Sequence, residues 1–378
     1  MSETAVSHNP YVGPRTFEEA EADRFFGRER EARELVALVL SERLTLFYAQ
    51  SGAGKSSLLN ARLVPRLRDK EGFAVLPVGR VSGVLPDGVD LATIDNIFVY
   101  HLILGLSQKL SERAAQTAGD QDVGLPDLLH TSLARFLSGE SGPDTAPDAD
   151  TATAGPSSAD STADLIPHVL IIDQFEELLT TYPDRWPERP GFFEQLNAAM
   201  ARHPNLWVVL TLREDYVAGL EPYSHLTPNR LRARFYMQRM GTEAAREAIE
   251  RPAANAGRPF AEGVAGRLVD NLRMVRTAGQ AEYHAGEYVE PVQLQVVCFQ
   301  LWQDLHARPA PTIELADLER LAGGGSLAEY VDHALSDFYE KTITKVIETA
   351  EVGVTEPVLR KWFSDELITE AGTRSIVF

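Results

Sequence analysis

The sequence is nearly devoid of cysteine, because Cys298 stands alone in the apolar run 296–299. A single thiol excludes a disulfide framework within the chain, and its apolar neighbours predict a buried core residue. No run of 18 apolar residues occurs, and residues 1–10 are mostly polar. These absences predict neither a membrane span nor a secretory signal, so we expect a cytoplasmic protein that makes no membrane contact.

Basic residues are also scarce, with 36 Lys and Arg against 55 Asp and Glu, a net charge of −19. Residues 310–378 alone carry 6 basic and 13 acidic side chains. Phosphate backbones repel such a surface, so we expect no direct DNA binding. The nine histidines lack metal-ligand spacing, and no C-x-x-C or G-x-S-x-G motif occurs, so neither a zinc site nor a serine hydrolase is supported.

The strongest motif that is present is a glycine-rich run between an apolar strand, Leu44–Tyr48, and an apolar helix start. We call this run, AQSGAGKSS at residues 49–57, the phosphate loop. Such a turn points backbone N–H groups at a phosphate, and the helix N-terminus adds positive dipole. The alternative is a Gly/Ser-rich turn that happens to contain a lysine. The residues expected to bind nucleotide here are Ser51, Gly52, Ala53, Gly54, Lys55, Ser56 and Ser57.

Within the phosphate loop, Lys55 is expected to reach the outer phosphates, and the Ser56 hydroxyl to hold Mg²⁺. Ala49 replaces the first glycine of the G-x-x-x-x-G-K-[ST] pattern. That position lies at the strand end, away from the phosphates, so an alanine should be tolerated.

Strands alternate with helices up to residue 240, which predicts a parallel sheet with helices on both faces. Beyond Gly241 the pattern becomes helical, with Thr242 expected to cap a helix that Pro252 ends. The insertion at 139–164 holds six acidic residues and no basic one, which predicts a disordered surface loop. The strands expected are 44–49, 73–81, 169–172, 206–212 and 234–240.

The apolar strand 169–172 ends in Asp173, followed by Gln174, Phe175, Glu176 and Glu177. Ligands bind at the carboxyl edge of an open parallel sheet, so Asp173 is a candidate Mg²⁺ ligand beside Ser56. The alternative for Asp173 is a helix cap. A carboxylate near the γ-phosphate, Glu176 or Glu177, can orient the attacking water, and the sequence does not decide which. The alternative is two solvated glutamates favoured by the helix dipole.

Two further sites have competing interpretations. Arg213 ends the strand 206–212, where a guanidinium can contact the γ-phosphate, or else pair with Glu214 or Asp215. The segment Phe25-Phe26-Gly27-Arg28-Glu29 precedes the first helix and can form an apolar slot for a base. On composition alone, a helix entry with a hydrophobic staple is the better explanation for it.

Together these motifs, with residues 9–15 (NPYVGPR), resemble the novel STAND NTPase 1 family, whose members are signalling ATPases related to NACHT and NB-ARC switches. The resemblance implies an AAA+-like NTPase domain at 25–240 after an extension at 1–24, and a helical lid at 241–350. Residues 351–378 would then open a winged helix, and the apolar end at 376–378 indicates a piece of a longer protein.

The same resemblance implies roles for single residues. Lys55 and Ser56 become phosphate and Mg²⁺ ligands, Asp173 the Walker B aspartate, and Arg213 a sensor of the γ-phosphate. It also makes Phe26, Gly27 and Arg28 contacts on the adenine side, against the composition-only interpretation. Gln174 stands where many related ATPases carry the catalytic glutamate, which argues for slow hydrolysis.

Several functions are compatible with these residues. The leading prediction is a Mg²⁺-dependent ATP/ADP switch with slow turnover, acting in bacterial signalling or antiphage defence. We expect it to self-associate on activation and to respond to a protein trigger or effector that the sequence does not identify. A nucleotide-locked scaffold is the main alternative. A GTPase is disfavoured because no Asn-Lys pair occurs, and a DNA-binding regulator is disfavoured by the acidic charge.

Overall fold

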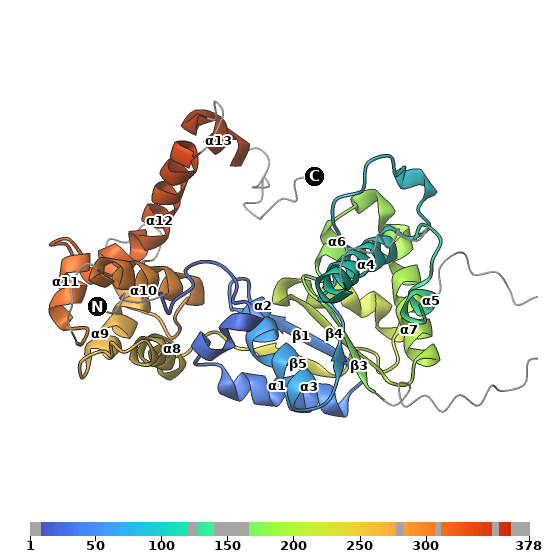
Figure 1. The fold of residues 1–378 in the computed structure, drawn as a ribbon, viewed down its shortest axis with the longest axis horizontal. Helices are drawn as coiled ribbons and strands as arrows, with labels where there is room; N and C mark the ends of the chain where they lie inside the picture. The colour runs from blue at the N-terminus through green and yellow to red at the C-terminus, as the bar shows by residue number, and fades with distance from the viewer. Residues whose placement is uncertain are drawn as a thin grey trace, which may run out of the picture. The chain divides into compact units, whose positions relative to one another are not determined.

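The computed structural model describes residues 9–118, 128–139, 166–276, 283–306, 311–349 and 355–363 (Figure 1). The chain forms two compact units. The helical unit contains Met1–Glu31, Ser51–Arg62 and Gln238–Phe378, and the sheet unit contains Ala32–Gln50 and Leu63–Met237. Apart from Gly139, the predicted disordered insertion lies outside the described residues, as do the apolar residues 376–378.

The sheet unit is built on five strands in the order β2-β3-β4-β1-β5. Every neighbouring pair is parallel, which confirms the predicted sheet type. The order places β4 between β1, which leads into the phosphate loop, and β3, which leads into Asp173. The strands are β1 (Leu44–Ala49), β2 (Ala74–Val75), β3 (His168–Ile172), β4 (Leu206–Arg213) and β5 (Arg234–Met237).

Helices cover both faces of this sheet. Figure 1 shows α1 and α3 on one side of the sheet and α4, α5 and α7 on the other. Strand side chains alternate between the faces, and both faces are buried, as expected for a parallel sheet. The helices of this unit are α1 (Glu29–Ser41, shared with the helical unit), α3 (Val64–Asp69), α4 (Ile97–Ala118), α5 (Leu133–Leu137), α6 (Glu177–Thr180) and α7 (Arg189–Arg202), with 3₁₀ turns η3 (Leu91–Thr93), η5 (Pro183–Glu188) and η6 (Glu214–Leu226).

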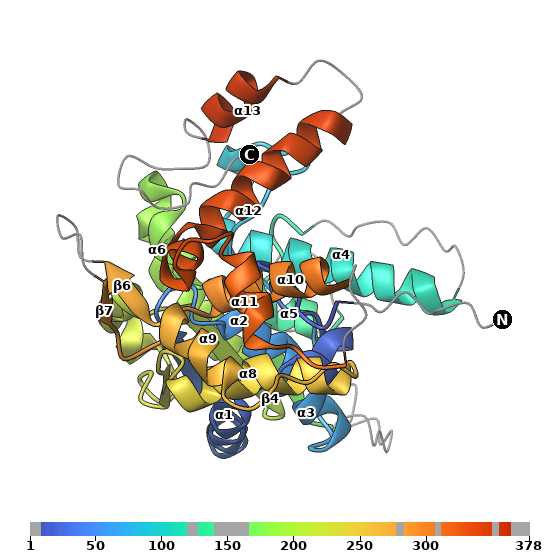
Figure 2. The same ribbon diagram turned by 90° about the vertical axis from the view of Figure 1, so that its left-hand side faces the viewer.

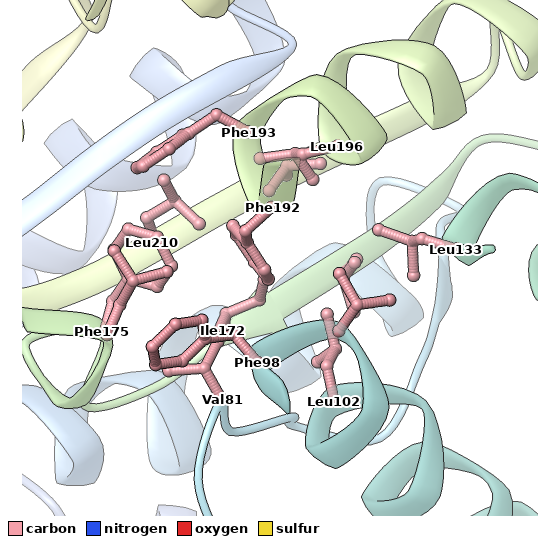
Figure 3. Packing of buried hydrophobic residues seen from close by; sticks show 14 of the residues in the cluster. Val81, Phe98, Leu102, Leu133, Ile172, Phe175, Phe192, Phe193, Leu196 and Leu210 are labelled. Carbon is pink, nitrogen blue, oxygen red and sulfur yellow. The ribbon is translucent and has the colours of Figure 1, made fainter. Parts of the chain in front are cut away.

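One apolar cluster fills the space between the sheet and α4, α5 and α7 (Figure 3). Phe175, which follows β3, packs against two rings of α7. Its ring centroid lies 5.5 Å from that of Phe192, which is tilted, and 5.8 Å from that of Phe193, which is edge-on. This aromatic packing fixes the segment after β3, and with it the position of Asp173 and the two glutamates.

The helical unit contains a second apolar cluster, made by α8 to α12 and by Tyr11 near the N-terminus. Figure 2 shows α8, α9, α10 and α11 packed together, with α12 extending from them. The elements are η1 (Glu19–Arg24), α2 (Lys55–Leu58), η2 (Leu59–Leu63), α8 (Thr242–Asn255), α9 (Val264–Leu272), β6 (Met274–Arg276), β7 (Tyr283–Ala285), α10 (Pro291–His306), α11 (Leu315–Leu321), α12 (Leu327–Thr349) and α13 (Glu356–Trp362).

Several predicted element boundaries were wrong. Helix α8 continues through Pro252 to Asn255, and Gly241 rather than Thr242 is its N-cap. Pro252 cannot donate a backbone hydrogen bond, but it is buried with its neighbours in the helical core, which compensates for the lost bond. The strand predicted at 73–81 is only β2 plus an isolated bridge at Gly79, because Pro77 cannot donate to the ladder.

Candidate functional site

The phosphate loop has the backbone geometry that its glycines predicted. Gly52 has φ +75° and Gly54 has φ +94°, both in the left-handed region that glycine adopts without strain. A Cβ on either would meet nothing within 4 Å, so the space above the loop is open. Gly54 is the N-cap of α2, and its carbonyl accepts the Leu58 N–H at 2.9 Å, which starts the helix.

The polar side chains at this helix start differ in their surroundings. Lys55 and Ser56 are half-buried at the first and second helical positions, where a phosphate ligand and a metal ligand are expected. Ser57 instead accepts a hydrogen bond from the Phe17 N–H at 3.3 Å. Its hydroxyl therefore fastens the N-terminal segment to the phosphate loop.

That segment, residues 9–17, is called the N-terminal strap. Its Tyr11 hydroxyl is buried and donates to the Ile249 carbonyl of α8 at 2.6 Å. Its Phe17 carbonyl accepts from the Asn60 side chain, one turn beyond the phosphate loop, at 3.1 Å. The strap therefore joins the phosphate-loop helix to α8, and no local pattern had predicted these contacts.

A recess opens beside the phosphate loop, entirely within the helical unit. The strap, the segment around Phe25, the phosphate loop, α8 and the start of α10 all line it. Phe17 and Phe25 form an edge-to-face pair at 5.1 Å between ring centroids on one wall. An apolar recess next to phosphate-binding N–H groups suits a nucleotide base. Its apolar walls include Phe17, Phe25, Phe26, Met240, Val292 and Leu294.

Among the residues predicted on the adenine side, Phe26 lines the recess, with the Arg251 guanidinium 4.3 Å above its ring. Gly27 has φ +82°, and a Cβ there would collide with the Ala244 carbonyl oxygen. Gly27 is therefore required for the close approach of this segment to α8, and a nucleotide contact by it remains a prediction.

Arg28 also has a structural role that the sequence did not reveal. Only 2% of its surface is exposed, and it donates to the Ala53 carbonyl of the phosphate loop at 3.3 Å. It also donates to Glu31 at 2.6 Å and to the Gln238 carbonyl at 3.1 Å. The buried guanidinium thus joins the phosphate loop to Glu31 and Gln238, and any contact of Arg28 with nucleotide remains a prediction.

At the carboxyl edge of the sheet, Asp173 follows β3 and is 6% exposed. Its Oδ1 accepts hydrogen bonds from the Thr211 hydroxyl of β4 and from the Gln174 N–H. Gln174 has φ +54°, which is uncommon for a residue with a side chain. The bonds to Asp173 and the buried Phe175 hold this strained turn in place.

Glu176 and Glu177 point to different partners. Glu176 accepts the backbone N–H of Arg213 at 3.2 Å, which links the end of β3 to the end of β4. Glu177 is buried, accepts a hydrogen bond from the Ser82 hydroxyl at 2.6 Å, and lies 3.8 Å from the Arg80 guanidinium. Burial raises the pKa of Glu177, while the Ser82 bond and Arg80 oppose that rise.

The residue after Ser82 takes part in a small polar network. The neighbouring Gly83 carbonyl accepts from the Tyr182 hydroxyl at 3.3 Å, and that hydroxyl lies 2.8 Å from His101 Nε2. Burial lowers the pKa of His101 to about 4, so its ring is neutral at pH 7. The contact between Ser82 and Glu177 was not predicted, because 95 residues separate them.

Arg213 is the last residue of β4 and pairs in the sheet with Ala49, the last residue of β1. Its guanidinium donates to Asp215 at 2.6 and 3.2 Å and lies 5.6 Å from the Tyr216 ring. The structure therefore contains the ion pair that was the alternative interpretation, and the γ-phosphate contact remains a prediction.

The two predicted metal ligands lie in different units, and each has the chemistry that a magnesium ion requires. The Asp173 carboxylate and the Ser56 hydroxyl are hard oxygen ligands, which Mg²⁺ prefers, and Mg²⁺ normally takes its other ligands from phosphate and water. Within the described ranges, no three His, Cys, Asp or Glu side chains gather to hold a metal by themselves.

The parallel sheet, the phosphate loop after β1 and the carboxylate after β3 define a P-loop NTPase. The family model named Novel STAND NTPase 1 matches residues 10–357, so the chain belongs to this family. A comparison with curated protein sequences found no match.

Solved structures with a similar fold include the Walker-type ATPase Paby2304 of Pyrococcus abyssi, at 15% identity and a TM-score of 0.45, covering 98% of this chain and 97% of that one. The ADP form of the Aeropyrum pernix ORC2 protein has 14% identity and a TM-score of 0.46, covering 99% and 85%. In the described part of the chain, no helix has the length and apolarity that crossing a membrane requires.

Proposed function

We propose that the protein is a STAND-type switch that binds ATP and ADP with Mg²⁺ and hydrolyses ATP slowly. The observation that carries this proposal is the recess, in which an open, glycine-built phosphate loop adjoins an apolar aromatic wall. Lys55 would contact the outer phosphates, and Ser56 and Asp173 would supply oxygen ligands to the metal.

We further propose that Glu177 is the carboxylate that activates the attacking water. Its pKa is raised, which suits a general base, since a base accepts a proton most efficiently when its pKa lies near the working pH. Glu176 would then serve to align the ends of β3 and β4, and Arg213 would exchange Asp215 for the γ-phosphate.

In this proposal the ADP-bound form is closed, and ATP favours an open form that self-associates and engages a protein trigger or effector. The family resemblance suggests bacterial signal transduction, including antiphage defence, as the setting.

The direct test is Lys55→Ala, with Lys70→Ala, an exposed lysine just after α3, as the matched control. Loss of a charge-assisted phosphate contact should weaken binding of fluorescent ATP by at least about tenfold in the first variant only. Equal affinity in both variants would contradict nucleotide binding at this loop.

The second candidate is a nucleotide-locked scaffold, which Gln174 favours because it puts an amide directly after the Walker B aspartate. Denaturing the purified protein and identifying the released nucleotide by chromatography separates the two proposals. ADP that exchanges for ATP and is regenerated by hydrolysis supports the switch. A nucleotide that co-purifies and never turns over supports the scaffold.

A further inference from the structure

The polar side chains that line the recess are nearly all committed to protein partners. Arg15 donates to Glu21 at 2.7 Å, and Arg24 donates to the same carboxylate and to the Asn9 carbonyl at 3.0 Å. Arg28 and Ser57 are bound as described above. These groups are therefore poorly placed to read the edge of a base.

Gln295, on the second turn of α10, is different. Its Oε1 accepts the Val12 N–H of the N-terminal strap at 3.1 Å. Within the described residues, its amide nitrogen has no hydrogen-bond partner. Three apolar residues of the same helix, Pro291, Val292 and Leu294, line the recess with Gln295.

The contact with Val12 determines which atom of the Gln295 amide, oxygen or nitrogen, is already hydrogen-bonded. A backbone N–H can only donate, so the oxygen of Gln295 must face the Val12 N–H. If the amide were reversed, its NH₂ group would face that N–H, and two donors would meet. Gln295 lines the recess, so its amide N–H groups are the donors that it has left for a ligand there. Adenine and guanine both present N3 and N7 as hydrogen-bond acceptors. Their N1 atoms differ, because N1 of adenine is an unprotonated acceptor and N1 of guanine carries a proton. A donor therefore distinguishes the two bases at N1.

We propose that Gln295 recognises the base by donating to N1 of adenine, and that Val12 of the strap orients the Gln295 amide. This inference rests on the proposed nucleotide-binding function and adds a specificity-determining residue to it. It also links base recognition to the strap, because the same amide contacts both. In this proposal the strap contributes to the adenine site indirectly, through the Gln295 side chain that Val12 holds.

The test is Gln295→Glu, which keeps an acceptor for Val12 and replaces the donor by a second acceptor. Gln303→Glu, an exposed glutamine on the same helix, is the matched control for added charge. Affinities for ATP and GTP are measured by competition against one fluorescent nucleotide. We expect ATP affinity to fall about tenfold, GTP affinity to fall less, and the control to keep the wild-type ratio.

An unchanged ATP-to-GTP ratio, or an equal loss of both nucleotides, would overturn the assignment of Gln295. Wild-type protein that binds neither nucleotide would instead overturn the proposed function. If the glutamate variant does not fold by circular dichroism, Gln295→Met replaces it. That variant is similar in length and has no N–H donor, so the same preferential loss of ATP binding is expected.

Discussion

At the scale of single residues, the glycines of this chain serve two different purposes. Gly52 and Gly54 need their left-handed backbone and leave open space above the phosphate loop. Gly27 needs both its backbone and its missing side chain, because α8 approaches it closely. The motif predicted the first purpose, whereas the close approach of α8 to Gly27 was not predicted. The nucleotide contact that the family resemblance implies for Gly27 stays a prediction.

Replacing Gly27 by alanine should lower the free energy of unfolding by about 3 kcal/mol, from backbone strain plus the collision with Ala244. Gly72→Ala is the matched control, since Gly72 has φ +75° and nothing within 4 Å of a Cβ. That control should cost only about 1 kcal/mol. Urea unfolding measures both, and equal losses would refute the packing role of Gly27.

A second residue-scale prediction concerns Glu21. The Arg15 hydrogen bond, together with the Glu18 N–H and Arg24, holds the pKa of Glu21 at about 2, below its ordinary value of 4.5. A lowered folded-state pKa stabilises the protein above pH 4.5, and this stabilisation is lost as the pH falls toward 2. Glu21→Gln should therefore cost about 2 kcal/mol at pH 7 and progressively less below pH 4.5.

The measurement for Glu21 is urea unfolding at several pH values between 7 and about 3.5, with the exposed Asp23→Asn as control. A loss of stability that does not depend on pH would indicate a packing defect rather than a lost ion pair.

At the scale of elements, local patterns predicted most strands and helices but not how each is fastened. The runs at β1, β3 and β4 are almost continuously apolar and buried, which is typical of parallel strands covered on both faces, and all three were predicted. The interrupted β2 and the proline inside α8 were wrong because tertiary packing outweighed the local signal. Likewise, the segment after β2 is anchored by Ser82 to Glu177, a contact that no local pattern encodes.

This anchoring gives an element-scale prediction for catalysis. Ser82→Ala removes a hydrogen bond that lowers the pKa of Glu177, so that pKa should rise further. If Glu177 acts as a base, the acidic limb of the pH–rate profile for ATP hydrolysis moves to higher pH. The control is Ser41→Ala, at an exposed serine. An unshifted profile with normal turnover would exclude Glu177 as the base.

At the scale of the whole molecule, the net negative charge disfavours binding to polyanions such as DNA. The sequence carries a net charge of −19, so long-range repulsion should oppose contact with any polyanion. We expect no binding to duplex DNA by fluorescence anisotropy, even at low ionic strength. Affinity that rises steeply as salt is removed would contradict this expectation and would locate a basic surface that the overall charge conceals.

The sequence by itself determined the phosphate loop, the parallel type of the sheet and the acidic residues after β3. Each of these follows from a pattern of residues close together in the chain: the glycine-rich motif, the alternation of strands with helices, and the run of carboxylates. Tertiary structure alone decided the strand order, the hydrogen bond from Arg28 to the Ala53 carbonyl of the phosphate loop, and the contact of Val12 with Gln295. Those features join segments up to 283 residues apart. A local pattern specifies which face of an element is buried, but only packing specifies the partner against which it is buried.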